Sequence, residues 1–153
     1  MNLSLLSSTE LEAEFTSVVK SERKIMHEVL LFIQEIHRRS HHKIMGYDDL
    51  AKYLVEKHHY SEGPARQRIR AMEMLSTLPE LKDKIIEGEL TLTQLAMAQS
   101  AISHKQNTEN MTVSKEETIE LLLKMENQTI EETKSVIAET LQVDSREKTD
   151  HVW

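Results

Sequence analysis

The chain has 153 residues with no Cys, which excludes a disulfide framework, a Cys-based zinc site and a Cys nucleophile. Aromatic residues make up 4% and Gly and Pro number three and two, so the composition favours helices over strands. The net charge is −7, and no run of about 18 apolar residues exists to span a membrane. We therefore expect a cytoplasmic all-α protein.

The first predicted helix is the longest in the chain. Ser7 and Glu10 have the spacing of a capping box, which satisfies two free amides at a helix N-terminus. Apolar residues then recur at helical spacing, as in an amphipathic helix. We expect this helix to run to about His37 and to stop near residues 40–42.

Two shorter helices are predicted over residues 48–57 and 61–77. Asp48 can cap the first and Ser61 the second, since short oxygen-bearing side chains favour N-cap positions. The connector at residues 58–60 is short, although it contains no Gly. Two helices joined in this way are typical of a helix-turn-helix.

Four further helices complete the prediction. Pro79 begins a short helix that Gly88 closes, and Thr91 with Gln94 opens a helix to about residue 104. Residues 104–113 form a polar loop and a candidate hinge. Two more capping-box patterns then open a helical hairpin; they are Ser114 with Glu117 and Thr129 with Glu132.

These elements amount to about seven helices in three parts. Residues 1–104 form a helical core that contains the helix pair. Residues 114–142 form the hairpin, whose apolar seams either complete the same core or form a homodimer interface. A homodimer would suit a DNA-binding protein, because two-fold proteins bind two half-sites. Residues 143–153 are polar, and we expect a flexible tail.

Positive charge is concentrated around the helix pair. Residues 38–70 hold eight Lys or Arg against four Asp or Glu, a balance of +4, so the remainder of the −7 chain carries −11. A basic island of this kind indicates nucleic acid as a partner, because phosphates supply most non-specific affinity. The net charge of −7 for the whole chain argues against nucleic acid as a partner.

The helix pair supplies candidate DNA contacts. The second helix of a helix-turn-helix enters the major groove, and Arg or Gln there suits base edges and phosphates. With Ala65, Ile69 and Met72 facing the core, Gln67 and the arginines would face outward. The predicted DNA-binding residues are Lys52, Lys57, Ser61, Arg66, Gln67, Arg70, Arg38 and Arg39, with Lys43 extending the strip.

Two alternatives stay open at this point. The arginines can instead form an ordinary solvated face, paired with acids such as Glu62 and Glu73. The DNA interpretation predicts a non-catalytic transcriptional or nucleoid regulator that binds duplex DNA. The other interpretation is a protein–protein adaptor or regulatory domain that keeps the fold without DNA affinity.

Four runs carry a resemblance to known families. They are Gly46-Tyr47-Asp48-Asp49-Leu50, Tyr60-Ser61-Glu62-Gly63-Pro64-Ala65-Arg66-Gln67-Arg68-Ile69-Arg70-Ala71-Met72, Leu78-Pro79-Glu80 and Glu87-Gly88-Glu89-Leu90-Thr91-Leu92-Thr93-Gln94-Leu95-Ala96. Over most of residues 10–140 the chain resembles the helical N-terminal domain of bacterial HNH-nuclease-associated proteins. Over residues 45–102 it is more distantly similar to the helix-turn-helix region of ParB-type partition proteins.

The first resemblance implies a DNA-associated helical module, often attached to a C-terminal nuclease. An HNH nuclease needs a His and Asn cluster, and here Asp150-His151 stands at the end of the chain with no partner after it. We therefore expect a stand-alone relative or a fragment, with no enzymatic activity, no catalytic residue and no cofactor. The adjacent pairs His41-His42 and His58-His59 point apart on a helix, so we expect no metal site.

Overall fold

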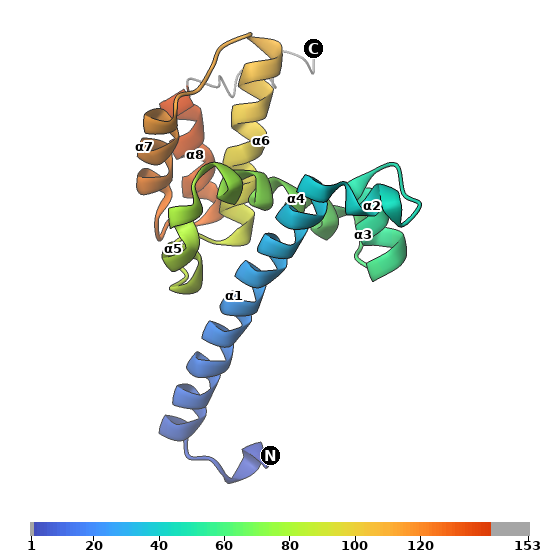
Figure 1. Cartoon of the computed structure of the whole chain (residues 1–153). Coiled ribbons are helices and arrows are strands. Elements are labelled where there is room, and N and C mark those ends of the chain that lie inside the picture. The colour runs from blue at the N-terminus through green and yellow to red at the C-terminus, as the bar shows by residue number, and fades with distance from the viewer. Residues whose placement is uncertain (1, 142–153) are drawn as a thin grey trace, which may run out of the picture.

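The computed structural model describes residues 2–141, which form eight α-helices, two short 3-10 helices and no strand (Figure 1). The prediction of an all-α fold is therefore confirmed for this part of the chain. The predicted tail at 143–153, with Asp150-His151, lies outside the described residues. Within residues 2–141 no helix combines the length and the apolarity that crossing a membrane requires.

Helix α1 (Ser8–Arg39) is the long amphipathic helix expected from the sequence. The predicted capping box forms, with Ser7 and Glu10 each bonding the other's backbone amide. The helix ends at Ser40, which adopts a left-handed conformation. Only its second half joins the core, since the side chains of residues 8–18 are all exposed and the first turns project beyond the other helices (Figure 1).

The predicted helix pair corresponds to α3 (Leu50–His58) and α4 (Glu62–Thr77), preceded by a single turn, α2 (His41–Ile44), that the sequence did not indicate. Asp49 caps α3 by accepting the Ala51 amide at 3.2 Å, so the expectation that Asp48 is the cap was wrong. His59 begins the connector in the left-handed region, at φ 62°. This is a conformation for which glycine is the usual residue.

Helix α4 is central to the fold, because it contacts α1, α3 and α6. After it, the predicted single helix is split into a 3-10 turn, η2 (Pro79–Leu81), and α5 (Lys82–Ile86). Gly88 follows the end of α5 in a left-handed conformation at φ 79°. The side chain of Arg23 joins α1 to this region by donating to the Ile86 carbonyl at 2.7 Å.

Helix α6 (Leu92–Thr108) is longer than expected, because it takes up the first residues of the predicted loop at 104–113. No Gly or Pro interrupts this stretch. Lys105 also donates to the carbonyl of Leu141, which ties the end of α6 to the end of the hairpin. The polar loop that remains is correspondingly shorter.

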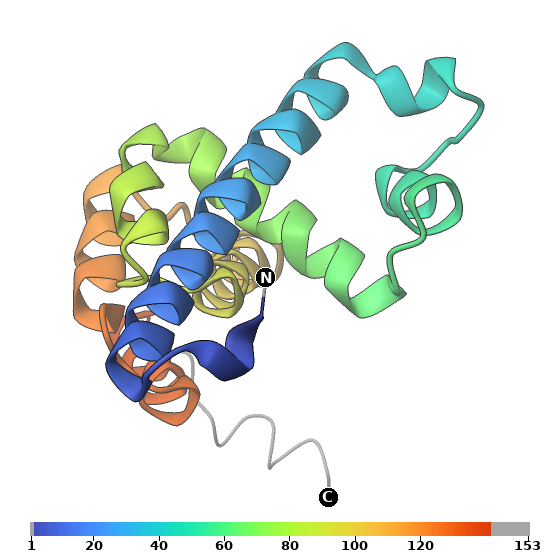
Figure 2. The ribbon, with the colours of Figure 1, turned by 90° about the horizontal axis from the view of Figure 1, so that it is seen from below.

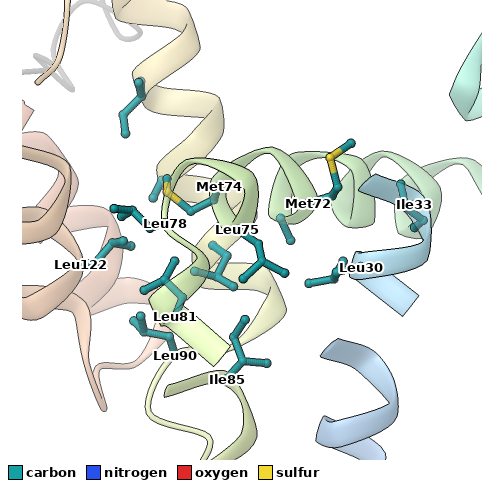
Figure 3. Close-up of a cluster of buried hydrophobic side chains, with 14 of the residues drawn as sticks. Leu30, Ile33, Met72, Met74, Leu75, Leu78, Leu81, Ile85, Leu90 and Leu122 are labelled. Atoms are coloured by element: carbon teal, nitrogen blue, oxygen red, sulfur yellow. The ribbon is translucent and has the colours of Figure 1, made fainter. Parts of the chain in front are cut away.

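The hairpin consists of α7 (Lys115–Met125) and α8 (Ile130–Leu141), and both helices contact α6. Its apolar seams supply buried residues to the same hydrophobic cluster as α1 and α4; they are Leu121, Leu122, Met125, Ile137 and Leu141. Figure 3 shows Leu122 beside Leu78 and Leu81 in this cluster. The hairpin therefore helps to complete the core of its own chain.

Candidate nucleic-acid interface

The basic island forms one end of the molecule. Helices α2 and α3 and the start of α4 lie beyond the end of α1, away from α5, α7 and α8, in both views (Figures 1 and 2). We call residues 38–70 the basic lobe. Its balance of +4 is therefore separated in space from much of the acidic remainder.

Two arginines mark the exposed face of α4. Arg66 and Arg70 are one helical turn apart, and both side chains are exposed to solvent. Arg66 lies 3.1 Å from Glu62 and Arg70 lies 3.6 Å from Glu73, each within the same helix. Both of the ion pairs weighed in the sequence analysis are thus present.

The start of α4 is only partly as predicted. Ser61 occupies the N-cap position, but its side chain makes no capping hydrogen bond. The hydroxyl group therefore stands beside the first amides of a 16-residue helix without being used to cap them. Helix N-termini of this kind attract anions, because several amide groups point along the axis without intrahelical partners.

Gln67 does not face outward, and the expectation that it lies on the exposed face was wrong. Its side-chain amide donates to the hydroxyl of Thr93 at 3.0 Å, and the residue is half-buried. Because α4 packs on α6 along this line, Gln67 belongs to the contact between the two helices. The helical period alone placed it too far from that contact.

The two predicted lysines lie on α3. Lys52 and Lys57 are both exposed, and the ammonium of Lys52 lies 3.9 Å from the carboxylate of Glu56. That separation is at the long end for an ion pair and leaves the ammonium largely hydrated. Both lysines are therefore accessible to a partner of the lobe.

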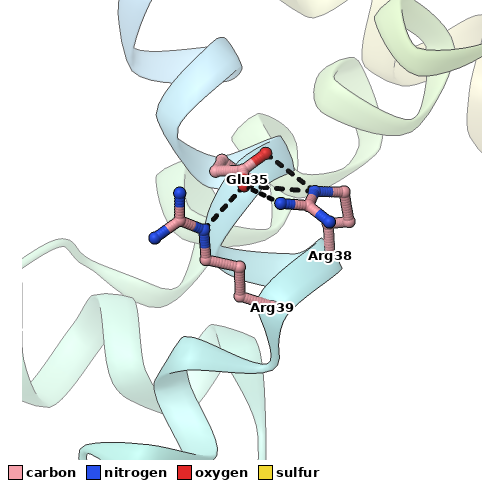
Figure 4. A network of polar contacts seen from close by, with 3 residues as sticks. All are labelled: Glu35, Arg38 and Arg39. Carbon is pink, nitrogen blue, oxygen red and sulfur yellow. Dashed lines mark hydrogen bonds and ion pairs between the residues drawn. The ribbon is translucent and has the colours of Figure 1, made fainter.

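Arg38 and Arg39 share one carboxylate at the end of α1 (Figure 4). The Nε of Arg38 donates to Glu35 at 2.9 Å, and the Nε of Arg39 donates to the same carboxylate at 2.7 Å. These hydrogen bonds lower the pKa of Glu35 to about 2. The three side chains together carry a net charge of +1 on an exposed surface.

Arg68 has a role that the sequence analysis did not assign. Its guanidinium lies 4.9 Å from the centre of the Tyr60 ring, and its Nη1 donates to the Pro64 carbonyl at 3.0 Å. Arg68 and Tyr60 form one wall of a groove of about 510 Å³ whose other wall is α1. No periodic pattern signals such a contact, because it depends on how the connector places Tyr60 against α4.

Of the four histidines of the lobe, His42 is buried, His41 is half-buried, and His58 and His59 are exposed. His42 is 5% exposed, and burial lowers its pKa below the ordinary value of 6.5, so it stays neutral at physiological pH. The Nε2 of His58 lies 3.0 Å from the Tyr53 hydroxyl, and the ring of Tyr47 packs edge-on against the ring of Tyr53. Among residues 2–141, no group of three or more His, Asp or Glu is placed to hold a metal ion.

Comparisons with protein-family models, with curated proteins and with solved structures find no match to the chain. The geometry of the lobe is that of a helix-turn-helix-like pair, with an exposed Arg face on its second helix and further cations on the neighbouring helices.

Proposed function

We propose that the protein binds duplex DNA through the basic lobe and does not cut it. The observation that supports this most directly is the exposed face of Arg66 and Arg70 on the second helix of the α3–α4 pair. A three-residue connector separates these helices, at residues 59–61, which is within the range for helix-turn-helix motifs. In that arrangement α4 is the helix that enters the major groove.

The ion pairs in the lobe do not oppose this function. Exposed pairs three or four residues apart on a helix contribute about 0.3–0.5 kcal/mol each. A guanidinium that exchanges a glutamate for a phosphate gains a charge-assisted, bidentate contact and releases condensed counterions from the DNA. Breaking the pairs with Glu62 and Glu73 therefore costs little of the binding free energy.

The acidic remainder of the chain is compatible with the same proposal. The lobe carries +4 and the remainder −11, which gives the molecule a strong charge asymmetry. In the field of a DNA duplex, such a molecule is turned so that the lobe approaches first. Because the Lys and Arg side chains of the lobe would replace counterions on the DNA, we expect an affinity that falls as the salt concentration rises.

The test is fluorescence anisotropy of a labelled duplex at increasing salt concentration, with the full chain and an Arg66→Ala, Arg70→Ala double variant. We expect the full chain to bind at low salt. The double variant should lose about tenfold or more in affinity, since each lost contact is worth roughly 1 kcal/mol or more. The slope of the logarithm of its affinity against the logarithm of the salt concentration should fall in magnitude by about two, or nearly one for each phosphate contact removed.

A matched control is available on the hairpin. Lys124 and Lys134 are exposed and form ion pairs on their own helices, but they lie outside the basic lobe. Lys124→Ala with Lys134→Ala changes the net charge by the same amount and should leave the slope nearly unchanged. Absence of binding by the full chain at low salt would disprove the DNA proposal and leave the adaptor interpretation.

A further inference from the structure

An apolar stripe runs along the part of α1 that the core does not cover. Five large side chains on it are between 48% and 71% exposed; they are Leu11, Phe15, Val18, Ile25 and Phe32. A soluble helix normally buries its apolar face, because the burial of that face supplies most of its stability. This stripe has no covering element within residues 2–141.

The spacing along the stripe is that of a coiled coil. Intervals of four and three residues alternate without a break through the series Leu11, Phe15, Val18, Glu22, Ile25, Val29 and Phe32. Three heptads of this kind are the pattern of a helix that packs along a partner helix. Glu22 is the single polar position and lies in the middle of the series, where a buried polar residue commonly sets register.

The stripe also borders the groove described above. Val18, Glu22 and Ile25 form its α1 wall, opposite Tyr60 and Arg68. The Nε of Arg68 is buried and has no hydrogen-bond partner among residues 2–141. A buried cationic nitrogen without a partner is unfavourable, so this end of the groove is suited to an acidic side chain.

The free end of α1 is acidic. Glu10, Glu12 and Glu14 lie in its first turns, and no base is present between Ser8 and Val19. The groove with Arg68 borders the next turns of the same helix, from Val18 to Val29. One copy of the chain therefore offers a helix with an acidic start and an apolar stripe, and also an apolar groove that contains the guanidinium of Arg68.

We propose that a second copy of the chain covers this stripe, with the two α1 helices antiparallel. In the register that sets Phe15 against Ile25 of the second copy, Leu11 meets Val29 and Val18 meets Glu22. The acidic first turns of each copy then approach Arg68 of the other. A parallel pairing would instead set Glu22 against Glu22 and acidic turn against acidic turn, which is unfavourable.

The extent of the contact fits a reversible dimer. A contact limited to one face of a helix and the groove beside it lies at the small end of specific interfaces, which begin near about 1,000 Å² in total. We therefore expect a monomer–dimer equilibrium that responds to concentration. This inference does not rest on DNA binding and is tested without DNA.

The first experiment is sedimentation equilibrium on the full chain over a wide concentration range. We expect the mass to rise from 17.8 kDa toward twice that value. Phe15→Glu should hold the chain at the monomer mass. Ala13→Glu is the matched control, because residue 13 is exposed on the opposite side of the same helix and should leave the equilibrium unchanged. Circular dichroism of both variants checks that α1 stays helical.

The second experiment fixes the orientation, and the absence of native Cys makes it direct. Phe15→Cys and Ile25→Cys variants are oxidised separately and as a mixture. The antiparallel register predicts a disulfide dimer in the mixture and little in either variant alone. A monomer at all concentrations, a dimer that survives Phe15→Glu, or rapid self-linking of Phe15→Cys would each overturn the proposal.

Discussion

The side-chain amide of Gln94 donates to the carbonyl of Met125 at 2.7 Å, which joins α6 to the end of α7 inside the core. The same amide group donates to the Thr133 hydroxyl of α8 at 3.0 Å. The side-chain oxygen of Gln94 accepts a hydrogen bond from the backbone amide of Thr91. One buried residue therefore caps its own helix and holds both helices of the hairpin. This explains why the hairpin belongs to the same core as α4 and α6.

Gln94→Leu should lower the free energy of unfolding by about 1–3 kcal/mol, because it keeps the volume but removes the buried hydrogen bonds of the side-chain amide to the Met125 carbonyl, the Thr133 hydroxyl and the Thr91 amide. Urea denaturation followed by circular dichroism measures the change. Gln106→Leu is the control, since Gln106 is exposed on the same helix and should change stability by less than about 0.5 kcal/mol. Equal effects of the two variants would contradict the assigned role.

Leu30 and Leu31 are neighbours on α1 with different surroundings, and they offer a second matched pair. Leu30 is fully buried among core side chains (Figure 3), whereas Leu31 is 45% exposed. Leu30→Ala should cost about 2–5 kcal/mol, as is usual for a cavity in a packed core. Leu31→Ala should cost about 0.5 kcal/mol or less, and the same urea assay distinguishes them.

His59 has a left-handed backbone at φ 62°, which costs an L-residue roughly 1 kcal/mol relative to glycine. We therefore expect His59→Gly to raise the free energy of unfolding by about 0.5–1 kcal/mol. Lys57→Gly, two residues earlier and inside α3, should lower it by about the same amount. Urea denaturation should therefore give changes of opposite sign for the two variants. If both variants lower the free energy of unfolding, His59 does not have the left-handed conformation.

The Glu35 carboxylate should titrate far below the usual range. Its pKa is lowered from 4.5 to about 2 by Arg38 and Arg39, so the folded state binds its proton less readily than the unfolded state. The stabilisation is complete above pH 4.5 and is lost as the pH falls toward 2. A carboxyl-carbon NMR titration should find this low midpoint, and Arg38→Ala should raise it. Arg66→Ala should not change it.

Features coded by a few adjacent residues could be predicted from the sequence. The pairs Ser7 with Glu10, Thr91 with Gln94 and Ser114 with Glu117 all form capping boxes, since each depends on residues three positions apart. The helix N-termini that follow from them are confirmed. The end of α6 lies at Thr108 rather than near residue 104, and a capping box carries no information about where a helix ends.

The features that could not be predicted from the sequence depend on packing between segments that are distant along the chain. Helical period placed Gln67 on the outside, and only the contact between α4 and α6 shows that Thr93 holds it. The same limit applies to α1, where apolar spacing continues past the point at which the core ends. The pairing of Arg68 with Tyr60 has no sequence signal at all, because it is set by the turn between α3 and α4.

The projecting first turns of α1 have a consequence for hydrogen exchange. We expect the amides near Leu30, which is buried in the core, to exchange only through cooperative opening of the domain, and those near the exposed Phe15 to exchange through local fraying from Ser7. The two ends of one unbroken helix would therefore report two different free energies, that of global unfolding near Leu30 and that of local fraying near Phe15. In an isolated copy the protection should fall along α1 toward its start, and any partner that covers the first turns should raise it there and leave the second half unchanged.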